Sequence, residues 1–261
     1  MFKVTKRIAA VMLVAAMSLA FAACSDKKVE LTISAAASLT DALNEIKTIY
    51  EENYANTKLL YNFGASGALQ QQIEQGAPAD LFLSAATKNM KALVDGQLID
   101  GDKQTNLLAN ELVVVVPADG RADLPDENAL TAAEIKRVAI GIPESVPAGN
   151  YAKEALTTAN LWDKLQPKLV QAKDVRQVLQ YVETGNADAG FVYKTDALSS
   201  QKVKITFVVN PDSYAPVEYP IGIVKATKHG KEAEEFYRYL QTQEALDIFK
   251  KYGFSVPRSG Q

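Results

Sequence analysis

The chain has very little of the chemistry that metals and redox reactions need: one cysteine and one histidine in 261 residues. A single thiol permits neither an internal disulfide nor a cysteine-based metal site. A single histidine, without the aspartate spacing of a calcium loop, also argues against a dedicated metal centre. No glycine-rich phosphate loop of the nucleotide-binding kind is present. We therefore expect a protein that works without a cofactor.

The N-terminus has the pattern of a cleaved secretory signal over residues 1–23. Three basic residues precede an apolar segment at 8–20, which is shorter than the roughly 20 residues of a membrane span. Small residues then lead to Cys24, the position at which a bacterial lipoprotein signal, which this segment resembles, has its lipidated cysteine. Residues 24–29 would form the lipidated end and a polar tether. This pattern predicts a membrane-anchored lipoprotein in the periplasm or at the cell surface.

The mature chain is predicted to be acidic. The signal contains three of the 28 basic residues and none of the 31 acidic ones, so its removal makes the net charge more negative than the −3 of the whole sequence. An acidic protein does not attract nucleic acid, and its overall field weakly repels anions. Any anion site must therefore work through local dipoles and hydrogen bonds.

Apolar periodicity predicts alternating strands and helices, which indicates an α/β protein with helices covering sheets. Strands are expected at 31–36, 58–63, 80–84, 112–116, 138–142, 168–171, 189–193, 204–209 and 217–224. Helices are expected at 40–54, 67–75, 87–95, 129–136, 150–159, 175–184, 196–200, 231–241 and 244–252.

These strands are too many for one sheet, so two lobes are expected. The first would contain residues 30–110 and a return segment at 220–261, and the second residues 111–219. The uninterrupted apolar run Leu112–Val116 predicts a strand buried on both faces, as in a parallel sheet.

Four predicted helices begin directly after a strand, near Ser38, Ser66, Ala148 and Val175. Ligands of open α/β sheets bind at the carboxyl ends of strands. A helix start presents backbone N–H groups without intrahelical partners, together with the positive end of the helix dipole. Several such starts around one cleft would hold a small anion without arginine or lysine.

Each side chain at this predicted edge has an alternative role. Ser38 and Ser66 could be N-caps, which stabilise a helix by about 1 kcal/mol. Tyr193, at the end of a predicted strand, could be a packing residue or a neutral donor that reaches the cleft.

A serine hydrolase is the alternative from another functional class. Gly64-x-Ser66 is similar to a nucleophile elbow, but Ala68 stands where that pattern requires glycine. The only histidine that could serve as base is His229, in a predicted turn. We expect a binding protein and not an enzyme.

Six segments, in the same order along the chain, resemble the periplasmic molybdate-binding proteins of bacterial molybdate ABC transporters. They are Ala35-Ala-Ala-Ser-Leu-Thr40, Gly76-Ala-Pro-Ala-Asp-Leu-Phe82, Val146-Pro-Ala-Gly-Asn-Tyr-Ala-Lys-Glu-Ala-Leu156, Asp174-Val-Arg176, Gly190-Phe-Val-Tyr193 and Tyr252-Gly-Phe254. The resemblance covers roughly residues 30–256. That family often has a run of serines around the position of Ser66, whereas Ala65 and Gly67 flank it here.

The resemblance implies a two-lobed periplasmic-binding-protein fold of type II. Each lobe would be a mixed sheet flanked by helices, and the ligand would lie in the cleft between them. The implied ligand is molybdate or tungstate, held as an oxyanion with no direct bond to the metal. The implied contacts are Ser38, Ser66, Ala148, Val175 and Tyr193.

The implied partners are an ABC transporter permease and its ATPase, and the protein is expected to be a monomer. A receptor for another tetrahedral oxyanion, such as sulfate or phosphate, stays open as an alternative. So does a sensory module that binds the same anion but signals.

Overall fold

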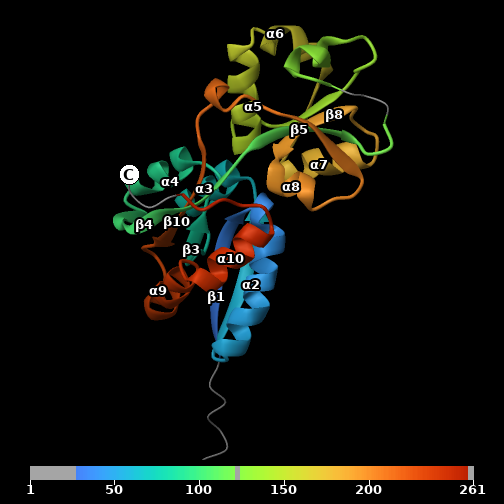
Figure 1. Cartoon of the computed structure of the whole chain (residues 1–261). Helices are drawn as coiled ribbons and strands as arrows, with labels where there is room; N and C mark the ends of the chain where they lie inside the picture. Colours follow the sequence, from blue (N-terminus) through green and yellow to red (C-terminus); the bar gives the residue numbers. More distant parts are fainter. Residues whose placement is uncertain (1–27, 121–123, 258–261) are drawn as a thin grey trace, which may run out of the picture.

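The computed structural model describes residues 28–120 and 124–257. They form two lobes, each built on a five-stranded mixed sheet flanked by helices (Figure 1). This confirms the predicted two-lobed α/β fold. The predicted signal peptide and Cys24 lie outside the described residues. Within the two described stretches, no helix is both long and apolar enough to cross a membrane.

The first lobe contains both ends of the described chain, and Figure 1 shows it in blue, teal and red. Its strand order is β2-β1-β3-β10-β4; β1, β2 and β3 run parallel, and β10 is antiparallel to β3 and β4. The strands are β1 (Val29–Ala36), β2 (Thr57–Gly64), β3 (Leu81–Leu83), β4 (Ile99–Asn110) and β10 (Val217–Val224). The helices are η1 (Ala37–Leu39), α2 (Thr40–Asn53), α3 (Ser66–Glu74), α4 (Thr87–Asp95), α9 (Gly230–Tyr239) and α10 (Gln243–Lys251).

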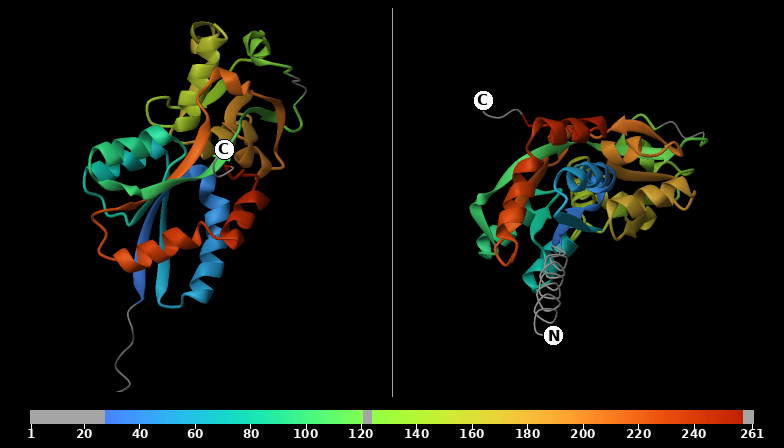
Figure 2. Two further views of the ribbon diagram at one scale, coloured as in Figure 1. Left: turned by 60° about the vertical axis from the view of Figure 1, so that its left-hand side comes forward. Right: turned by 90° about the horizontal axis from the view of Figure 1, so that it is seen from below.

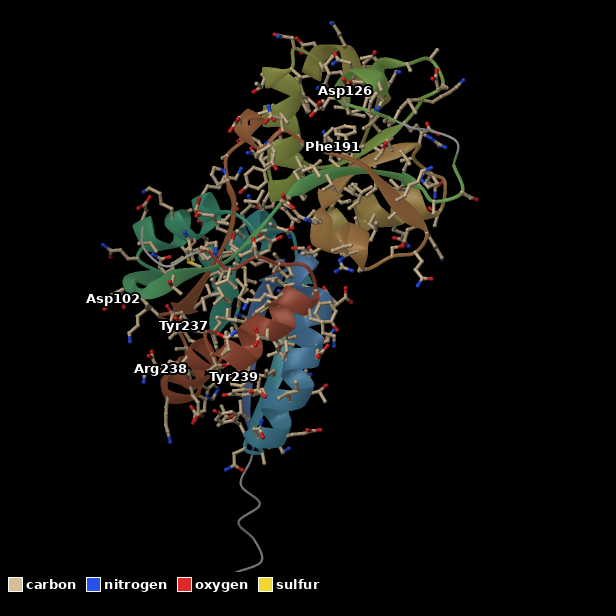
Figure 3. All side chains as sticks on the ribbon, in the orientation of Figure 1. Asp102, Asp126, Phe191, Tyr237, Arg238 and Tyr239 are labelled. Carbon is tan, nitrogen blue, oxygen red and sulfur yellow. The ribbon has the colours of Figure 1, made fainter. Side chains whose placement is uncertain are left out.

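The second lobe has the strand order β7-β6-β8-β5-β9, with β6, β7 and β8 parallel. Its strands are β5 (Leu112–Pro117), β6 (Val138–Gly141), β7 (Leu169–Ala172), β8 (Ala189–Tyr193) and β9 (Val203–Val208). Its helices are η2 (Glu127–Thr131), α5 (Pro147–Thr158), α6 (Trp162–Leu165), η3 (Gln166–Lys168), α7 (Val175–Glu183), α8 (Lys194–Leu198) and η4 (Pro211–Ser213). Phe191 of β8 is fully buried in the core of this lobe (Figure 3).

The chain passes between the lobes twice. It leaves the first sheet at Asn110, the last residue of β4, and enters the second sheet at Leu112, the first residue of β5. After β9 it returns through η4 and joins β10 at Val217. Figure 2 shows these passages side by side where the lobes meet. Two neighbouring passages of this kind can act as a hinge between the lobes.

Strand β5 corrects one expectation. Its residues from Leu112 to Val116 are fully buried, as predicted. The strand is, however, antiparallel to both β8 and β9. Its continuous apolar run therefore reflects its interior place in the sheet and not parallel pairing.

Two other differences concern a helix that was expected and a strand that was not. The helix predicted over 129–136 is absent, and that region has only the short η2, which ends at Thr131. The 12-residue strand β4 escaped prediction because it lies at the edge of its sheet and most of residues 100–106 are exposed. Without a buried face at its start, it has no apolar alternation to detect.

Candidate functional site

Six parallel strands, three from each lobe, direct their carboxyl ends toward one small cavity between the lobes. β1, β2 and β3 contribute from the first lobe, and β6, β7 and β8 from the second. The cavity is small: the space open to the centre of a water-sized sphere is about 10 Å³. Its lining is Ala36, Ala37, Ser38, Gly64, Ala65, Ser66, Ala85, Val146, Pro147, Ala148, Val175 and Tyr193.

All five residues predicted to bind an anion line this cavity. Two come from the first lobe and three from the second: Ser38, Ser66, Ala148, Val175 and Tyr193. Each is at most 4 % exposed. None of the lining residues has a charged side chain. The cavity therefore offers hydroxyl groups and backbone dipoles and neither a cation nor a carboxylate.

Neither serine is an N-cap, which corrects one of the two interpretations of each. Helix α3 begins at Ser66 itself, and its N-cap is Ala65, without a side-chain hydrogen bond. The Ser66 Oγ accepts a hydrogen bond from the Ala85 N–H at 2.9 Å. Because Oγ is the acceptor in that bond, the hydroxyl hydrogen of Ser66 remains available to donate.

Ser38 lies in η1, the single turn between β1 and α2. Helix α2 has Leu39 as its N-cap and no side-chain cap, so Ser38 does not cap it. The Ser38 Oγ instead lies 2.9 Å from the Tyr219 Oη, and both residues are buried. Its hydroxyl is therefore fixed by a side-chain partner and not by its own helix.

Two helix starts of the second lobe bring backbone N–H groups to the cavity. Helix α5 begins with Pro147, followed by Ala148, and its N-cap residue makes no side-chain bond. Helix α7 begins at Val175, after Asp174, whose side chain accepts from the Gln177 N–H. The N–H groups of Ala148 and Val175 belong to first turns and so have no intrahelical acceptor. They are the groups that an anion can use.

The N–H after Ser66 is not available to a ligand. It belongs to Gly67, the second residue of α3. The Gly67 N–H donates instead to the Ser145 carbonyl oxygen of the second lobe, at 2.9 Å. Gly67 thus joins the lobes beside the cavity.

Tyr193 is the one lining side chain whose polar atom lacks a protein partner. Its Oη is buried and makes no hydrogen bond to any described residue. Burial raises the pKa of Tyr193 well above its usual value, so the phenol stays protonated. A buried phenol without a partner is costly unless something accepts its hydrogen bond, and a bound oxyanion would be such an acceptor.

Further contacts hold the lobes together around the cavity. The Tyr151 Oη of α5 donates to the Ala85 carbonyl oxygen of the first lobe, at 3.4 Å. Arg176 of α7 forms an ion pair with Asp41 of α2, with 2.7 Å between Nη2 and Oδ2. With the Gly67 bond, these contacts close the lobes over the cavity.

Arg176 also binds a second carboxylate, within its own lobe. Its Nε lies 2.7 Å from the Oδ1 of Asp196, which is fully buried. Burial raises the pKa of Asp196 to about 6, although the nearby Arg176 charge acts in the opposite direction. Arg176 therefore neutralises a carboxylate that the protein desolvates, and it connects that carboxylate to the other lobe.

The described residues support neither a metal site nor a serine hydrolase. Among them no group of three or more histidine, cysteine, aspartate or glutamate side chains could hold a metal ion. His229, the base that a hydrolase would need, is the N-cap residue of α9 and is not part of the cavity lining.

The sequence alone assigned no role to Arg176 or Tyr219, which lie next to the cavity-lining residues. Arg176 was part of a resembling motif but had no assigned role, and its partner Asp41 is 135 residues away. Tyr219 lies 181 residues from Ser38. No local pattern links such pairs; only the pairing of strands and the meeting of lobes brings them together.

Comparison with known proteins gives consistent results. Residues 31–255 match the family described as bacterial extracellular solute-binding protein. The chain is 56 % identical to the putative ABC transporter substrate-binding lipoprotein YvgL of Bacillus subtilis, over 89 % of this chain and 88 % of that protein. It is 42 % identical to the molybdate-binding protein ModA of Escherichia coli, over 87 % and 89 % of the two chains.

A solved structure is also similar. The substrate binding domain of a putative molybdenum ABC transporter from Clostridium difficile superposes with a TM-score of 0.67 at 44 % identity, over 88 % of this chain and 99 % of that one.

Proposed function

Because this chain belongs to the bacterial extracellular solute-binding proteins, we propose that it captures molybdate, and tungstate as well, and delivers the oxyanion to the permease of an ABC transporter. The observation that carries the proposal is the cavity between the lobes, which contains hydrogen-bond donors and no charged side chain. The relative at 42 % identity is named for molybdate binding, which supports the ligand. The relative at 56 % identity is named for an ABC transporter, which supports the transport system.

The donor set suits a tetrahedral dianion. Three hydroxyl groups, of Ser38, Ser66 and Tyr193, surround the cavity together with the helix starts at Ala148 and Val175. Hydrogen bonds to an ionised oxygen are stronger than neutral ones. They gain further strength where water is excluded. Neutral donors can therefore hold the dianion without a compensating positive side chain.

The same donor set argues against phosphate. Molybdate, tungstate and sulfate carry no proton near neutral pH, whereas phosphate does. A protonated oxygen needs an acceptor, and the lining residues include no carboxylate. A donor that faces another donor leaves a buried polar group unsatisfied. Sulfate has the right charge, so its exclusion depends on the cavity size, because sulfate is smaller than molybdate.

The anion must enter by separation of the lobes. All lining residues except Gly64 are buried, so the closed lobes cover most of the cavity. We propose that the lobes part at the two chain passages, admit the anion, and close through Gly67 and Arg176. The closed form would then be the species that docks on the permease.

The remaining parts of the proposal concern location and assembly. Cys24 would be lipidated and would hold the protein, as a monomer, on the outer side of a membrane. The similarity to a putative lipoprotein supports this location. We expect no enzymatic activity: the Ser66 Oγ accepts from the Ala85 N–H, and His229, the one histidine of the sequence, does not line the cavity.

Ser66→Ala tests the proposed site directly. The substitution removes one donor to the oxyanion, which costs about 1.5–3 kcal/mol of binding energy, or a roughly 10- to 150-fold weaker Kd. Titration calorimetry with sodium molybdate on residues 26–261 measures this change.

Ser84→Ala is the matched control. Ser84 is also fully buried and lies close in sequence to the cavity-lining Ala85, but its hydroxyl bonds only the backbone of Ala86. The Ser84→Ala substitution should lower thermal stability and leave the Kd for molybdate unchanged. Equal Kd values for wild type and Ser66→Ala would contradict the proposed site.

A further inference from the structure

A chain of hydrogen bonds runs from Ser38 to the point at which the protein chain passes between the lobes. The Ser38 Oγ is 2.9 Å from the Tyr219 Oη, and that oxygen is 3.3 Å from the Asn110 Nδ2. The same Nδ2 lies 2.9 Å from the Thr195 Oγ1. Ser38, Tyr219 and Thr195 are buried, and Asn110 is half-buried. The contact between Ser38 and Tyr219 is therefore shielded from competing water, and the Asn110 amide is partly shielded.

The Asn110 amide sets the direction of this chain. Its Oδ1 accepts a hydrogen bond from the Glu111 N–H at 2.9 Å. That bond fixes which end of the amide faces which way. The Nδ2 group, which can only donate, then provides one hydrogen to Thr195 and one to Tyr219. Tyr219 consequently receives a hydrogen bond at its oxygen and must place its own hydrogen elsewhere.

Only one acceptor for the Tyr219 hydrogen is available among the described residues. The Tyr219 Oη has two hydrogen-bonding neighbours, the donor Asn110 and the hydroxyl of Ser38. If Ser38 donated to Tyr219, the buried phenol hydrogen would have no acceptor, which is costly. Tyr219 therefore donates to the Ser38 Oγ. The Ser38 hydrogen is left to point away from Tyr219, and Ser38 lines the cavity.

We infer that Asn110 and Tyr219 are positioning residues that commit the Ser38 hydroxyl to donating to the bound anion. This inference rests on the proposed function, since it assigns the two residues to the oxyanion site. Neither residue lines the cavity. Their effect on the ligand passes through the orientation of one hydroxyl group.

The location of Asn110 adds a connection to lobe closure. Asn110 is the last residue of β4, directly before the passage into β5. Its partner Thr195 belongs to α8 of the second lobe, whereas Tyr219 belongs to β10 of the first. The amide thus holds both lobes at the passage, and the donor chain is complete only when α8 and β10 are both in place around it.

A double-mutant cycle with Ser38→Ala and Tyr219→Phe tests the inference. Residues 26–261 contain every described helix and strand and serve as the protein, with sodium molybdate as the probe in titration calorimetry. We expect Tyr219→Phe to weaken binding about fivefold and Ser38→Ala about 30-fold. Because Tyr219 acts through Ser38, the double variant should bind no more weakly than Ser38→Ala alone. Independent effects would multiply to about 150-fold, and that result would overturn the inference.

Asn110→Asp gives a second and sharper readout. A carboxylate at this position accepts from Tyr219, so the phenol oxygen becomes an acceptor for the Ser38 hydrogen. Asn110→Asp should therefore weaken binding. In that background Tyr219→Phe should strengthen binding, because it releases the Ser38 hydroxyl. A purely structural role of Tyr219 would give weaker binding in both backgrounds, which would also overturn the inference.

Tyr50→Phe is the control for loss of a buried hydroxyl group. Tyr50 is fully buried in the first lobe, and its Oη has no hydrogen-bond partner among the described residues. Its Kd should equal that of the wild type. Thermal unfolding without anion shows that each variant is folded. A folded wild type that binds no molybdate would overturn the proposed function and the inference together, whereas multiplicative effects in a protein that binds would overturn the inference alone.

Discussion

Gly67→Ala is expected to weaken molybdate binding roughly 30-fold without destabilising the protein in the absence of the anion. A Cβ at Gly67 would lie 2.6 Å from the Ser145 carbonyl oxygen and 2.9 Å from its Cα. Both atoms are backbone, so neither can swing aside. Overpacking of this kind costs about 2 kcal/mol, and here that cost applies only when the lobes are closed.

When the lobes are apart, alanine at position 67 does not clash with Ser145. Gly67 is the second residue of helix α3, and alanine is a better helix former than glycine by about 1 kcal/mol. Thermal unfolding without anion should therefore give an unchanged or slightly higher Tm, while the rise in Tm caused by molybdate shrinks.

Gly230→Ala is the matched control for Gly67→Ala. Gly230 begins α9, and an added Cβ there would meet nothing within 4 Å. Its Kd should not change. If Gly67→Ala binds molybdate as tightly as wild type, then the contact between Gly67 and Ser145 is not part of the bound state.

Arg176→Met is expected to lower the unfolding free energy at pH 7 by about 3 kcal/mol. The substitution keeps most of the apolar stem but leaves the fully buried Asp196 without its cation. Loss of one partner of a buried ion pair typically costs 3–5 kcal/mol, and the lower end applies because the Arg176 side chain is 26 % exposed. The corresponding fall in Tm is roughly 6–12 °C. Anion binding should weaken too, because the contact with Asp41 across the lobes is lost.

The pH dependence of this variant identifies the cause. In the wild type, burial already raises the folded-state pKa of Asp196 to about 6, above the roughly 3.9 of an unfolded chain. A raised folded-state pKa gives stability at low pH that is lost as the pH rises through that value. Without Arg176 the pKa of Asp196 rises further. The deficit of Arg176→Met should therefore be larger at pH 7 than at pH 5.

Arg238→Met is the control for loss of a surface cation. Arg238 pairs with Glu234 on α9, is 75 % exposed, and lies at the end of the first lobe away from the second (Figure 3). An exposed pair contributes little, so stability should hardly change. A pH-independent deficit in Arg176→Met would show that lost packing, and not the Asp196 charge, causes the destabilisation.

The sequence was sufficient for those parts of the fold that local pattern determines. Alternating apolar segments located most strands and helices. Strand ends followed by helix starts pointed to Ser38, Ser66, Ala148 and Val175, a strand end pointed to Tyr193, and the family resemblance implied the same five as ligand contacts. Physical reasons explain the failures. Strand β4 exposes much of its length and so has no apolar alternation, and the direction of β5 depends on its neighbours, which a single strand does not encode.

The finer chemistry of the site depends on contacts between distant segments. Whether Ser66 caps its helix or accepts from Ala85 depends on where β3 ends relative to α3. Whether the Gly67 N–H faces a ligand or Ser145 depends on how the lobes meet. Pattern analysis can therefore identify the edge at which an anion site lies, but not which donors at that edge are already in use.

Thermal unfolding of residues 26–261 with molybdate, tungstate, sulfate and phosphate in turn is the most direct test of the central claim. A ligand that binds only the folded state at 100 times its Kd adds about 2.7 kcal/mol, which is a rise in Tm of roughly 5–11 °C. Molybdate and tungstate should give this rise, and sulfate and phosphate should not. No rise with any anion would contradict the assignment of the cavity as an oxyanion site. A rise with sulfate or phosphate alone would retain the two-lobed receptor but assign it a different ligand.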